Sequence, residues 1–201
     1  MEYGAGKAGL SSFIAAAAGK GSTFILVDRE PRRHKQDKLI KYLGLEVRRE
    51  LMDIKDFDLE KFDQAKSVIG IAKHLCGGAT DLALTSFMRI GKDRMKGLSI
   101  ATCCHHRCDT QTYVNMTYVT EELGIKETEF VSFVTRSSYA VSPGDDASKR
   151  RAGFMVKRLL DLGRLIFINN SLGLQVKGVQ YCDCATESPE STLIIGNKIN
   201  K

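Results

Sequence analysis

Short apolar runs rich in β-branched residues alternate with helical patterns through most of the chain. We predict strands at residues 23–27, 45–52, 67–72 and 98–102. We predict helices over residues 79–90 and 109–123, together with a helix that Pro31 opens and Gly44 ends. This alternation is typical of repeated βα units whose helices cover a parallel sheet.

The alternation breaks after Gly124. Residues 129–141 are mixed in pattern and are followed by the turn-forming segment 142–145, so we predict an inserted loop there. A long helix is expected over residues 146–167. Two strands are expected after it, at residues 174–182 and 192–196, joined by a turn around Pro189. Because this connection is too short for a crossover helix, the two strands should pair antiparallel.

The length and composition set the broad class. With 201 residues, of which 43% are hydrophobic and 27% charged, the chain can bury one continuous core, so residues 1–201 are predicted to form one domain. The glycine-rich segment begins at Gly4, which leaves only three residues for a first strand. We therefore expect that the chain starts inside an element and lacks an N-terminal region. No apolar run is long enough for a bilayer and no signal peptide is visible, so an intracellular location is predicted.

The charge and the cysteines refine this class. A net charge of +6 favours a polyanionic partner, although an ordinary basic surface would explain it equally well. Six cysteines in an intracellular chain of this length are expected to be reduced thiols, because disulfide frameworks belong to smaller secreted chains.

The segment from Gly4 to Gly9 has the pattern G-x-G-x-x-G, whose glycines allow a tight turn and let backbone amides approach a ligand at a helix N-terminus. Asp28 lies about twenty residues further on, at the end of the next predicted strand, where a carboxylate can accept hydrogen bonds from a ribose diol. Alternatively, Asp28 caps the helix that Pro31 opens. The pair of signals predicts a nucleoside-containing cofactor.

Two features favour S-adenosylmethionine over a dinucleotide. Glu2 would place a carboxylate near a cationic group, which a pyrophosphate would not favour, and the antiparallel strand pair resembles the closing strands of class I methyltransferases. Asp53 and Ile54, directly after the strand predicted at residues 45–52, match the place where that family contacts adenine, unless Asp53 simply ends the strand. The predicted cofactor-binding residues are Glu2, Tyr3, Gly4, Ala5, Gly6, Asp28, Arg29, Asp53, Ile54, Lys73, His74 and Leu75.

Three segments carry a more specific resemblance. Residues 2–7 (EYGAGK), 73–84 (KHLCGGATDLAL) and 103–108 (CCHHRC) closely resemble the catalytic domain of the eukaryotic tRNA acceptor-stem 2′-O-methyltransferases, and the likeness spans nearly the whole chain. That family methylates the ribose of the fourth nucleotide of certain tRNAs. The resemblance implies an α/β fold, namely a Rossmann-like class I S-adenosylmethionine-dependent methyltransferase. Its sheet would be seven-stranded and mostly parallel, with the antiparallel pair at its C-terminal end. The partner implied is tRNA, in the nucleus or cytoplasm.

Methyl transfer to a hydroxyl requires groups that hold the oxygen in line and help to remove its proton. We predict a catalytic site assembled from Lys73 and His74 on one loop and from His105, His106 and Arg107 on the next. A neutral imidazole can accept the proton, whereas Lys73 is better suited to bind phosphate or to orient the oxygen. The alternative is that His74 is a hydrogen-bonded core residue.

The Cys-Cys-His-His-x-Cys cluster at residues 103–108 also suggests zinc, because Cys and His are its usual ligands. The spacing argues against it. Neighbouring residues at a strand end point to opposite sides, and separated ligand pairs are missing, although Cys182 and Cys184 would be available to complete a site. We therefore predict no metal in this domain.

Basic clusters are the candidate RNA contacts, with solvated helix faces as the alternative. The predicted RNA-binding residues are Arg32, Arg33, Lys35, Lys149, Arg150 and Arg151, and a further cluster is Lys157 with Arg158. Other functions remain open from the sequence. They are a methyltransferase acting on a small molecule or a protein, a non-catalytic RNA-binding module, and a dinucleotide-dependent oxidoreductase.

Overall fold

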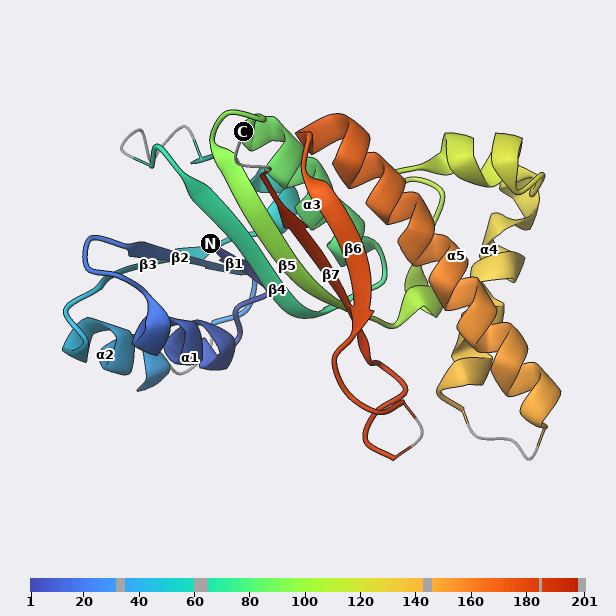
Figure 1. Ribbon diagram of the computed structural model, residues 1–201, viewed down its shortest axis with the longest axis horizontal. Coiled ribbons are helices and arrows are strands. Elements are labelled where there is room, and N and C mark those ends of the chain that lie inside the picture. Colours follow the sequence, from blue (N-terminus) through green and yellow to red (C-terminus); the bar gives the residue numbers. More distant parts are fainter. Residues whose placement is uncertain (32–34, 60–64, 143–145, 185, 199–201) are drawn as a thin grey trace.

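The computed structural model describes residues 1–31, 35–59, 65–142, 146–184 and 186–198. Its centre is a seven-stranded sheet in the order β3-β2-β1-β4-β5-β7-β6 (Figure 1). The strands are β1 (Glu2–Tyr3), β2 (Thr23–Asp28), β3 (Glu46–Leu51), β4 (Val68–Cys76), β5 (Met95–Cys103), β6 (Gln175–Gln180) and β7 (Thr192–Asn197). Strand β7 runs antiparallel to β5 and β6, and the other neighbouring strands are parallel. The predicted fold class is therefore confirmed.

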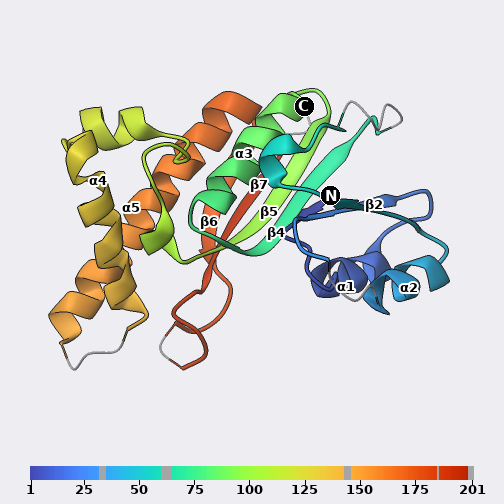
Figure 2. The same ribbon diagram turned by 180° about the vertical axis from the view of Figure 1, so that it is seen from behind.

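Helices cover both faces of this sheet. They are α1 (Gly9–Ala17), α2 (Lys35–Tyr42), α3 (Gly78–Ile90) and α5 (Ala147–Leu172), whereas α4 (Glu127–Thr135) packs against α5. Because the strand order reverses at β1 and crossovers are right-handed, α1 and α2 lie on one face and α3 on the other. Figure 2 shows α3 in front of β4 and β5 when the molecule is seen from behind.

The alternation of side chains along β2 fills two separate cores. Phe24 and Leu26 join the cluster under α1 and α2, whereas Ile25 and Val27 join the larger cluster that includes α3 and the end of α5. All four side chains are buried, which explains why this strand is a continuous apolar run. The sheet is thereby fixed between two helical layers, and the ends of its strands are held in place.

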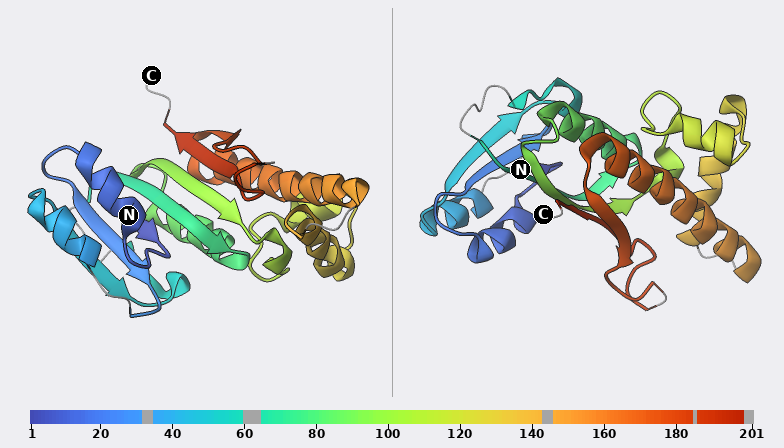
Figure 3. Two further views of the ribbon diagram at one scale, coloured as in Figure 1. Left: turned by 90° about the horizontal axis from the view of Figure 1, so that it is seen from below. Right: turned by 45° about the horizontal axis from the view of Figure 1, so that its top comes forward.

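The segment that was predicted to be an inserted loop is helical instead. Helix α4 continues into a 3-10 helix, η5 (Arg136–Ala140). Phe130, Phe133 and Val134 are buried, and their helical spacing gives α4 an apolar face. These side chains form a second cluster with Tyr113 and Leu160. Figure 3 shows α4 and the first half of α5 extending together beyond the sheet.

The helix predicted over residues 109–123 is also wrong for most of its length. The carboxylate of Asp109 accepts hydrogen bonds from the amides of Gln111 and Thr112, at 3.0 and 2.8 Å, and this Asx turn competes with a helix. A helical segment follows only from Met116, and it includes a π-helix, η4 (Tyr118–Glu122).

The remaining boundaries shift by a few residues. Strand β4 extends four residues beyond its predicted end, and α5 runs to Leu172 after an N-cap in which Asp146 accepts hydrogen bonds from Ser148 and Lys149. The start predicted at Pro31 is not tested, since residues 32–34 lie outside the described residues. In the described part of the chain, no helix combines the length and the apolar character that a membrane span requires.

Candidate active site

The carboxyl ends of the parallel strands meet at one edge of the sheet, where open α/β folds place their ligands. Three residues other than glycine have left-handed backbone in the described part of the chain, and all three lie at this edge: Ala8, His74 and Cys104, with φ of 61°, 62° and 43°. Such conformations cost free energy and concentrate at functional sites. We therefore examine this edge as the candidate active site.

The glycine turn is anchored to the end of β2. The amide of Gly6 donates a 2.7 Å hydrogen bond to Asp28 Oδ2, and the amide of Glu30 donates one of 2.9 Å to Asp28 Oδ1. At Gly4, where φ is 62°, an added Cβ would lie 2.5 Å from Leu75 Cδ2, so only glycine fits between β1 and β4. Asp28 thus holds the glycine turn in place.

Arg49 is a residue of this site that the sequence did not reveal. Its Nη1 donates a 3.0 Å hydrogen bond to the carbonyl of Gly6, and its other nitrogens form an ion pair with Asp37 at 2.8 Å. The sequence does not distinguish Arg49 from the other charged residues of β3. Only the pairing of β3 with β2 brings Arg49 close to the glycine turn. Arg49 therefore holds the carbonyl of Gly6, whose amide is held by Asp28.

Glu2 is buried at the end of β1. Its carboxylate accepts hydrogen bonds from the amide and the hydroxyl of Ser11 in the first turn of α1. Burial raises the pKa of Glu2, while the hydrogen bonds from Ser11 and the charges of the N-terminus and Arg49 act in the opposite direction. The carboxylate of Glu2 is thus bound to protein groups in the first turn of α1.

The other predicted cofactor residues divide into two groups. Tyr3, Ala5 and Leu75 belong to the core, with 0%, 4% and 5% exposure, and the hydroxyl of Tyr3 pairs with Ser86. Their side chains lie in the protein interior, so a cofactor contact by these residues is expected from backbone atoms. Open or half-open positions remain for the second group, which comprises Gly4, Gly6, Asp28, Arg29, Asp53, Ile54, Lys73 and His74. Asp53 also caps the 3-10 helix η1 (Ile54–Asp56) by accepting a hydrogen bond from the Lys55 amide.

Lys73 and His74 were predicted to lie on a loop after the strand. The structure places both within β4. Between Lys73 and Leu75 the register with β5 shifts, so His74 is an extra residue in the strand, a β-bulge. A strand normally alternates its side chains between faces, but this bulge leaves both Lys73 and His74 exposed and returns Leu75 to the core. The bulge therefore presents a cation and an imidazole side by side at the edge.

The segment after β5 forms a 3-10 helix, η3 (His105–Arg107), whose three side chains differ in accessibility. Arg107 is exposed and His106 is half-buried, but His105 is only 1% exposed. The ring Nε2 of His105 lies 2.8 Å from Asp161 Oδ1. The prediction that His105 contacts the reacting groups is corrected, because its side chain points into the protein.

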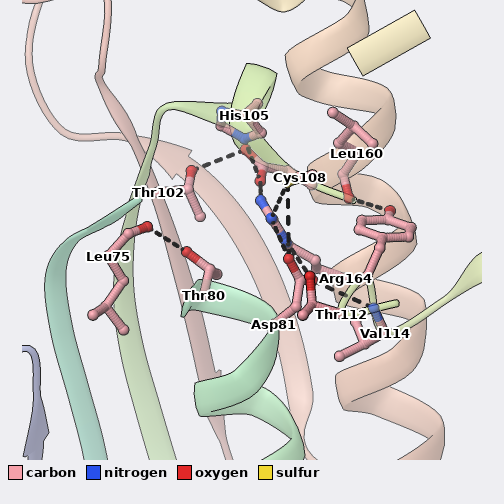
Figure 4. Close-up of polar contacts among 12 residues, drawn as sticks. Leu75, Thr80, Asp81, Thr102, His105, Cys108, Thr112, Val114, Leu160 and Arg164 are labelled. Carbon is pink, nitrogen blue, oxygen red and sulfur yellow. Dashed lines mark hydrogen bonds and ion pairs between the residues drawn. The ribbon is translucent and has the colours of Figure 1, made fainter. Parts of the chain in front are cut away.

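His105 is the outer member of a buried ionic network (Figure 4). Arg164, which is fully buried, donates two hydrogen bonds to Asp81, of 3.1 and 2.7 Å, and one of 3.0 Å to Asp161. Thr102 donates a further hydrogen bond of 3.0 Å to Asp161. Burial alone would raise the pKa of Asp161, but His105 and Arg164 outweigh it and lower this pKa to about 2. The network ties α3, α5 and the end of β5 together directly below η3.

Gly77 and Gly78, which connect β4 to α3, allow the end of β4 to approach η3 and the residues after it closely. An added Cβ at Gly77 would lie 2.5 Å from the carbonyl oxygen of Arg107, and one at Gly78 would lie 2.3 Å from Thr112 Oγ1. The close approach holds the end of β4 and the segment after β5 in fixed relative positions. The two parts of the predicted catalytic site are thus packed against each other.

We expect Gly77→Ala to lower the free energy of unfolding by about 2 kcal/mol or more, because it combines a positive φ with a backbone clash. The control is Gly21→Ala, which also has a positive φ but has no atom within 4 Å of the added Cβ. The difference between the two variants in the free energy of unfolding, measured with urea, gives the contribution of the clash, because both variants carry the backbone strain. Equal losses would contradict the tight contact between Gly77 and Arg107.

The predicted RNA contacts lie in two separate places. Lys149, Arg150 and Arg151 are exposed in the first turn of α5, and Lys35 is exposed at the first residue of α2. Figure 1 shows α2 and the start of α5 at opposite ends of the long axis. Arg32 and Arg33 lie outside the described residues.

Lys157 is not an RNA contact, contrary to the grouping with Arg158. It is 4% exposed, and its ammonium forms an ion pair with Glu190 and a 3.0 Å hydrogen bond to the Pro189 carbonyl. Lys157 therefore holds the β6–β7 connection against α5.

A cavity of about 690 Å³ lies away from these residues, at the amino ends of the strands. Met1, Thr23 and Ile69 are among its lining residues, and it opens between β2 and β4, where β1 contributes only two residues. None of the chemical groups described above lines it.

The strand order, the antiparallel β7 and the glycine turn at the carboxyl edge are those of a class I methyltransferase. Residues 1–152 match the family model described as Methyltransferase TRM13. The chain belongs to this family.

Individual relatives agree with this membership. A protein of Dictyostelium discoideum named tRNA:m(4)X modification enzyme TRM13 homolog is 30% identical over 98% of this chain and 48% of its own length. The human protein of the same name is 31% identical over 70% of this chain and 38% of its own length. The enzyme of Vanderwaltozyma polyspora is 31% identical, with coverage of 91% and 53%. This chain thus spans about half the length of the relatives it matches.

Among solved structures, the methyltransferase domain of bacterial CtHen1-CN aligns over 98% of this chain and 88% of its own. Its sequence is 12% identical and the TM-score is 0.48. We therefore assign the chain to the class I methyltransferases from its strand order and its family match, and not from this structural likeness.

Proposed function

We propose that this chain transfers a methyl group from S-adenosylmethionine to a ribose 2′-hydroxyl in the acceptor stem of tRNA. One observation carries the proposal: the glycine turn anchored by Asp28 and the exposed pair Lys73–His74 converge at the carboxyl edge of the sheet. The relatives are named as tRNA modification enzymes, which supports tRNA as the substrate. The 2′-hydroxyl is what the resemblance of residues 73–84 and 103–108 to the tRNA 2′-O-methyltransferases implies, and a tRNA substrate implies action in the nucleus or cytoplasm.

The residues at the edge suit an adenosyl cofactor. An added Cβ at Gly6 would meet no atom closer than the Gly4 carbonyl at 4.0 Å, so the turn is open on the side away from Leu75. Asp28, at the end of β2, and Asp53, after β3, offer carboxylates for the ribose and the adenine, as in other folds of this type. S-adenosylmethionine, when bound, supplies an electrophilic methyl group. Glu2 contributes negative charge near the start of α1 whenever its buried carboxylate is ionised.

Lys73 and His74 are the side chains that we assign to the acceptor hydroxyl. The imidazole of His74 can accept the hydroxyl proton, and the ammonium of Lys73 can orient the oxygen or bind the adjacent phosphate. His106 and Arg107 lie on the neighbouring η3, which Gly77 brings into contact with the end of β4. His105 is a positioning residue in this proposal, because it acts through η3 and touches no substrate.

The RNA surface is assigned to the start of α5. An A-form stem displays its 2′-hydroxyls in a wide, shallow minor groove, so recognition through shape and phosphate contacts is sufficient. Lys149, Arg150 and Arg151 are exposed there, on the same side of the molecule as the β6–β7 connection (Figure 1). Lys35, at the far end, is a separate contact, and Arg32 and Arg33 remain predictions from the sequence.

The test is methyl transfer by this 201-residue chain from labelled S-adenosylmethionine to a tRNA transcript. We expect a 2′-deoxy nucleotide at the fourth position of the acceptor stem to abolish transfer, because the acceptor oxygen is missing. A 2′-deoxy nucleotide at the fifth position is the matched control and should leave transfer intact. Equal transfer to both transcripts, or label in a base, would refute the ribose assignment.

A further inference from the structure

Three cysteines form a cluster that the proposed function does not use. Cys76 ends β4 and Cys103 ends β5, and the two are direct partners in the register of these strands. Their sulfurs lie 3.6 Å apart. Cys104 follows at once, and the three sulfurs all lie within 4.8 Å of one another.

The backbone of Cys104 explains how consecutive cysteines reach one point. In an extended strand Cys103 and Cys104 would point to opposite sides, which is why their spacing argued against a metal site. Cys104 instead has a left-handed conformation, with φ 43° and ψ 43°, and this turns its side chain towards that of Cys103. Its amide donates a 3.2 Å hydrogen bond to Glu190, which is held in turn by Lys157. The strained conformation is thus maintained from the β6–β7 connection.

The spacing of the sulfurs suits a tetrahedral ion. Zinc binds thiolate sulfur at about 2.3 Å, so two sulfurs on one tetrahedral zinc lie about 3.8 Å apart. The 3.6 Å separation of the Cys76 and Cys103 sulfurs is close to this distance. The Cys104 sulfur lies within 4.8 Å of both, so a shift of about 1 Å or less would bring it to the same distance. A disulfide, in contrast, requires a separation of about 2.05 Å and would leave the third sulfur unused.

We propose that Cys76, Cys103 and Cys104 form a three-thiolate site for zinc, with the fourth position open at the carboxyl edge of β4 and β5. Thiolates select zinc over harder cations such as magnesium, and three protein ligands with an open fourth position are the pattern of accessible zinc sites. Cys76 and Cys104 are half-buried, which gives the ion a path of entry, whereas Cys103 is buried. The thiol protons leave to solvent when the ion binds. This proposal stands apart from methyl transfer, because it rests on the sulfur cluster alone.

The experiment is a cobalt titration of the metal-free 201-residue chain under a phosphine reductant, which keeps the thiols reduced. We expect one equivalent of cobalt to produce thiolate-to-cobalt charge-transfer absorption and the intense visible bands of a tetrahedral ion. Added zinc should displace the cobalt and abolish both. Absence of a stoichiometric signal under these conditions would overturn the proposal, as would octahedral cobalt spectra.

Variants locate the site. Cys76→Ser and Cys104→Ser should each weaken zinc binding by about 100-fold or more, since loss of an outer-shell partner alone typically costs about 10–100-fold. Cys184→Ser is the matched control, because this thiol is also half-buried but lies outside the cluster, and it should bind zinc like the parent. Circular dichroism of each metal-free variant separates loss of a ligand from loss of the fold. A loss in Cys184→Ser as large as in Cys76→Ser would place the metal elsewhere and refute the assignment.

Discussion

Replacement of Arg164 by methionine is expected to lower the free energy of unfolding by about 3–5 kcal/mol, because it leaves buried carboxylates without their cation. Asp81 has 0% exposure and loses both hydrogen bonds of the guanidinium fork. Its remaining neighbours are the Val114 amide at 3.5 Å and the Cys108 sulfur at 3.9 Å, both weak donors at these distances. Asp161 keeps His105 and Thr102 but loses the contact of 3.0 Å with Arg164.

The measurement is urea or thermal unfolding, in which such a loss corresponds to a fall of about 6–20 °C in melting temperature for a chain of this length. Arg158→Met is the matched control, because Arg158 is exposed on the same helix, and its change should stay within about 0.5 kcal/mol. In a double-mutant cycle, Asp81→Asn should recover part of the loss caused by Arg164→Met. Similar stability of the Arg164 and Arg158 variants would show that the buried fork contributes little.

The network also links stability to the candidate site. Arg164 comes from α5, Asp81 from α3, and His105 from η3, so one guanidinium helps to set the relative positions of the elements around the candidate active site. Its loss should therefore loosen η3 before the chain unfolds globally. Protection of the amides of Arg107 and Cys108 from hydrogen exchange reports this directly, since they donate to the carbonyls of Cys104 and His105 and so close η3.

The parts of the site that follow local rules could be predicted from the sequence. Glycines in a fixed pattern before a helix give the turn, and Asp28 at the end of the next strand is bonded to that turn. The antiparallel pairing of β6 and β7 followed from a connection too short for a helix. In each case the deciding interaction lies within a few residues, or between neighbouring strands whose order the fold class fixes.

The rest depended on contacts between distant segments. No local pattern shows that β4 continues through a bulge at His74, or that His105 turns inward to reach Asp161, 56 residues away. The proximity of Cys76, Cys103 and Cys104 could not be predicted for the same reason, because Cys76 is 27 residues from Cys103 and the strand alternation fails at Cys104. The helix α4 was missed although Phe130, Phe133 and Val134 have helical spacing, because the surrounding polar residues made the segment read as mixed.

Replacement of His74 by asparagine is expected to lower the rate constant of methyl transfer by about 10²–10⁴-fold, the usual contribution of a group that moves a proton in the transition state. Asparagine is chosen because it tolerates left-handed backbone, so the bulge with φ 62° should persist while the proton acceptor is removed. The measurement is single-turnover transfer from S-adenosylmethionine to tRNA by the 201-residue chain. Transfer by His74→Asn within about threefold of the parent rate would exclude His74 as the proton acceptor.

Companion variants separate chemistry from binding. Lys73→Ala should reduce transfer less than His74→Asn, because it removes an orienting charge and leaves the proton acceptor in place. Lys66→Ala is its control, because Lys66 is also exposed but lies before β4, at the opposite end of that strand. All three variants should retain the rise in melting temperature that S-adenosylhomocysteine produces, since a ligand that binds only the folded state stabilises it. A variant that loses this rise has lost the cofactor, so its rate then reports binding at the glycine turn and says nothing about proton transfer at β4.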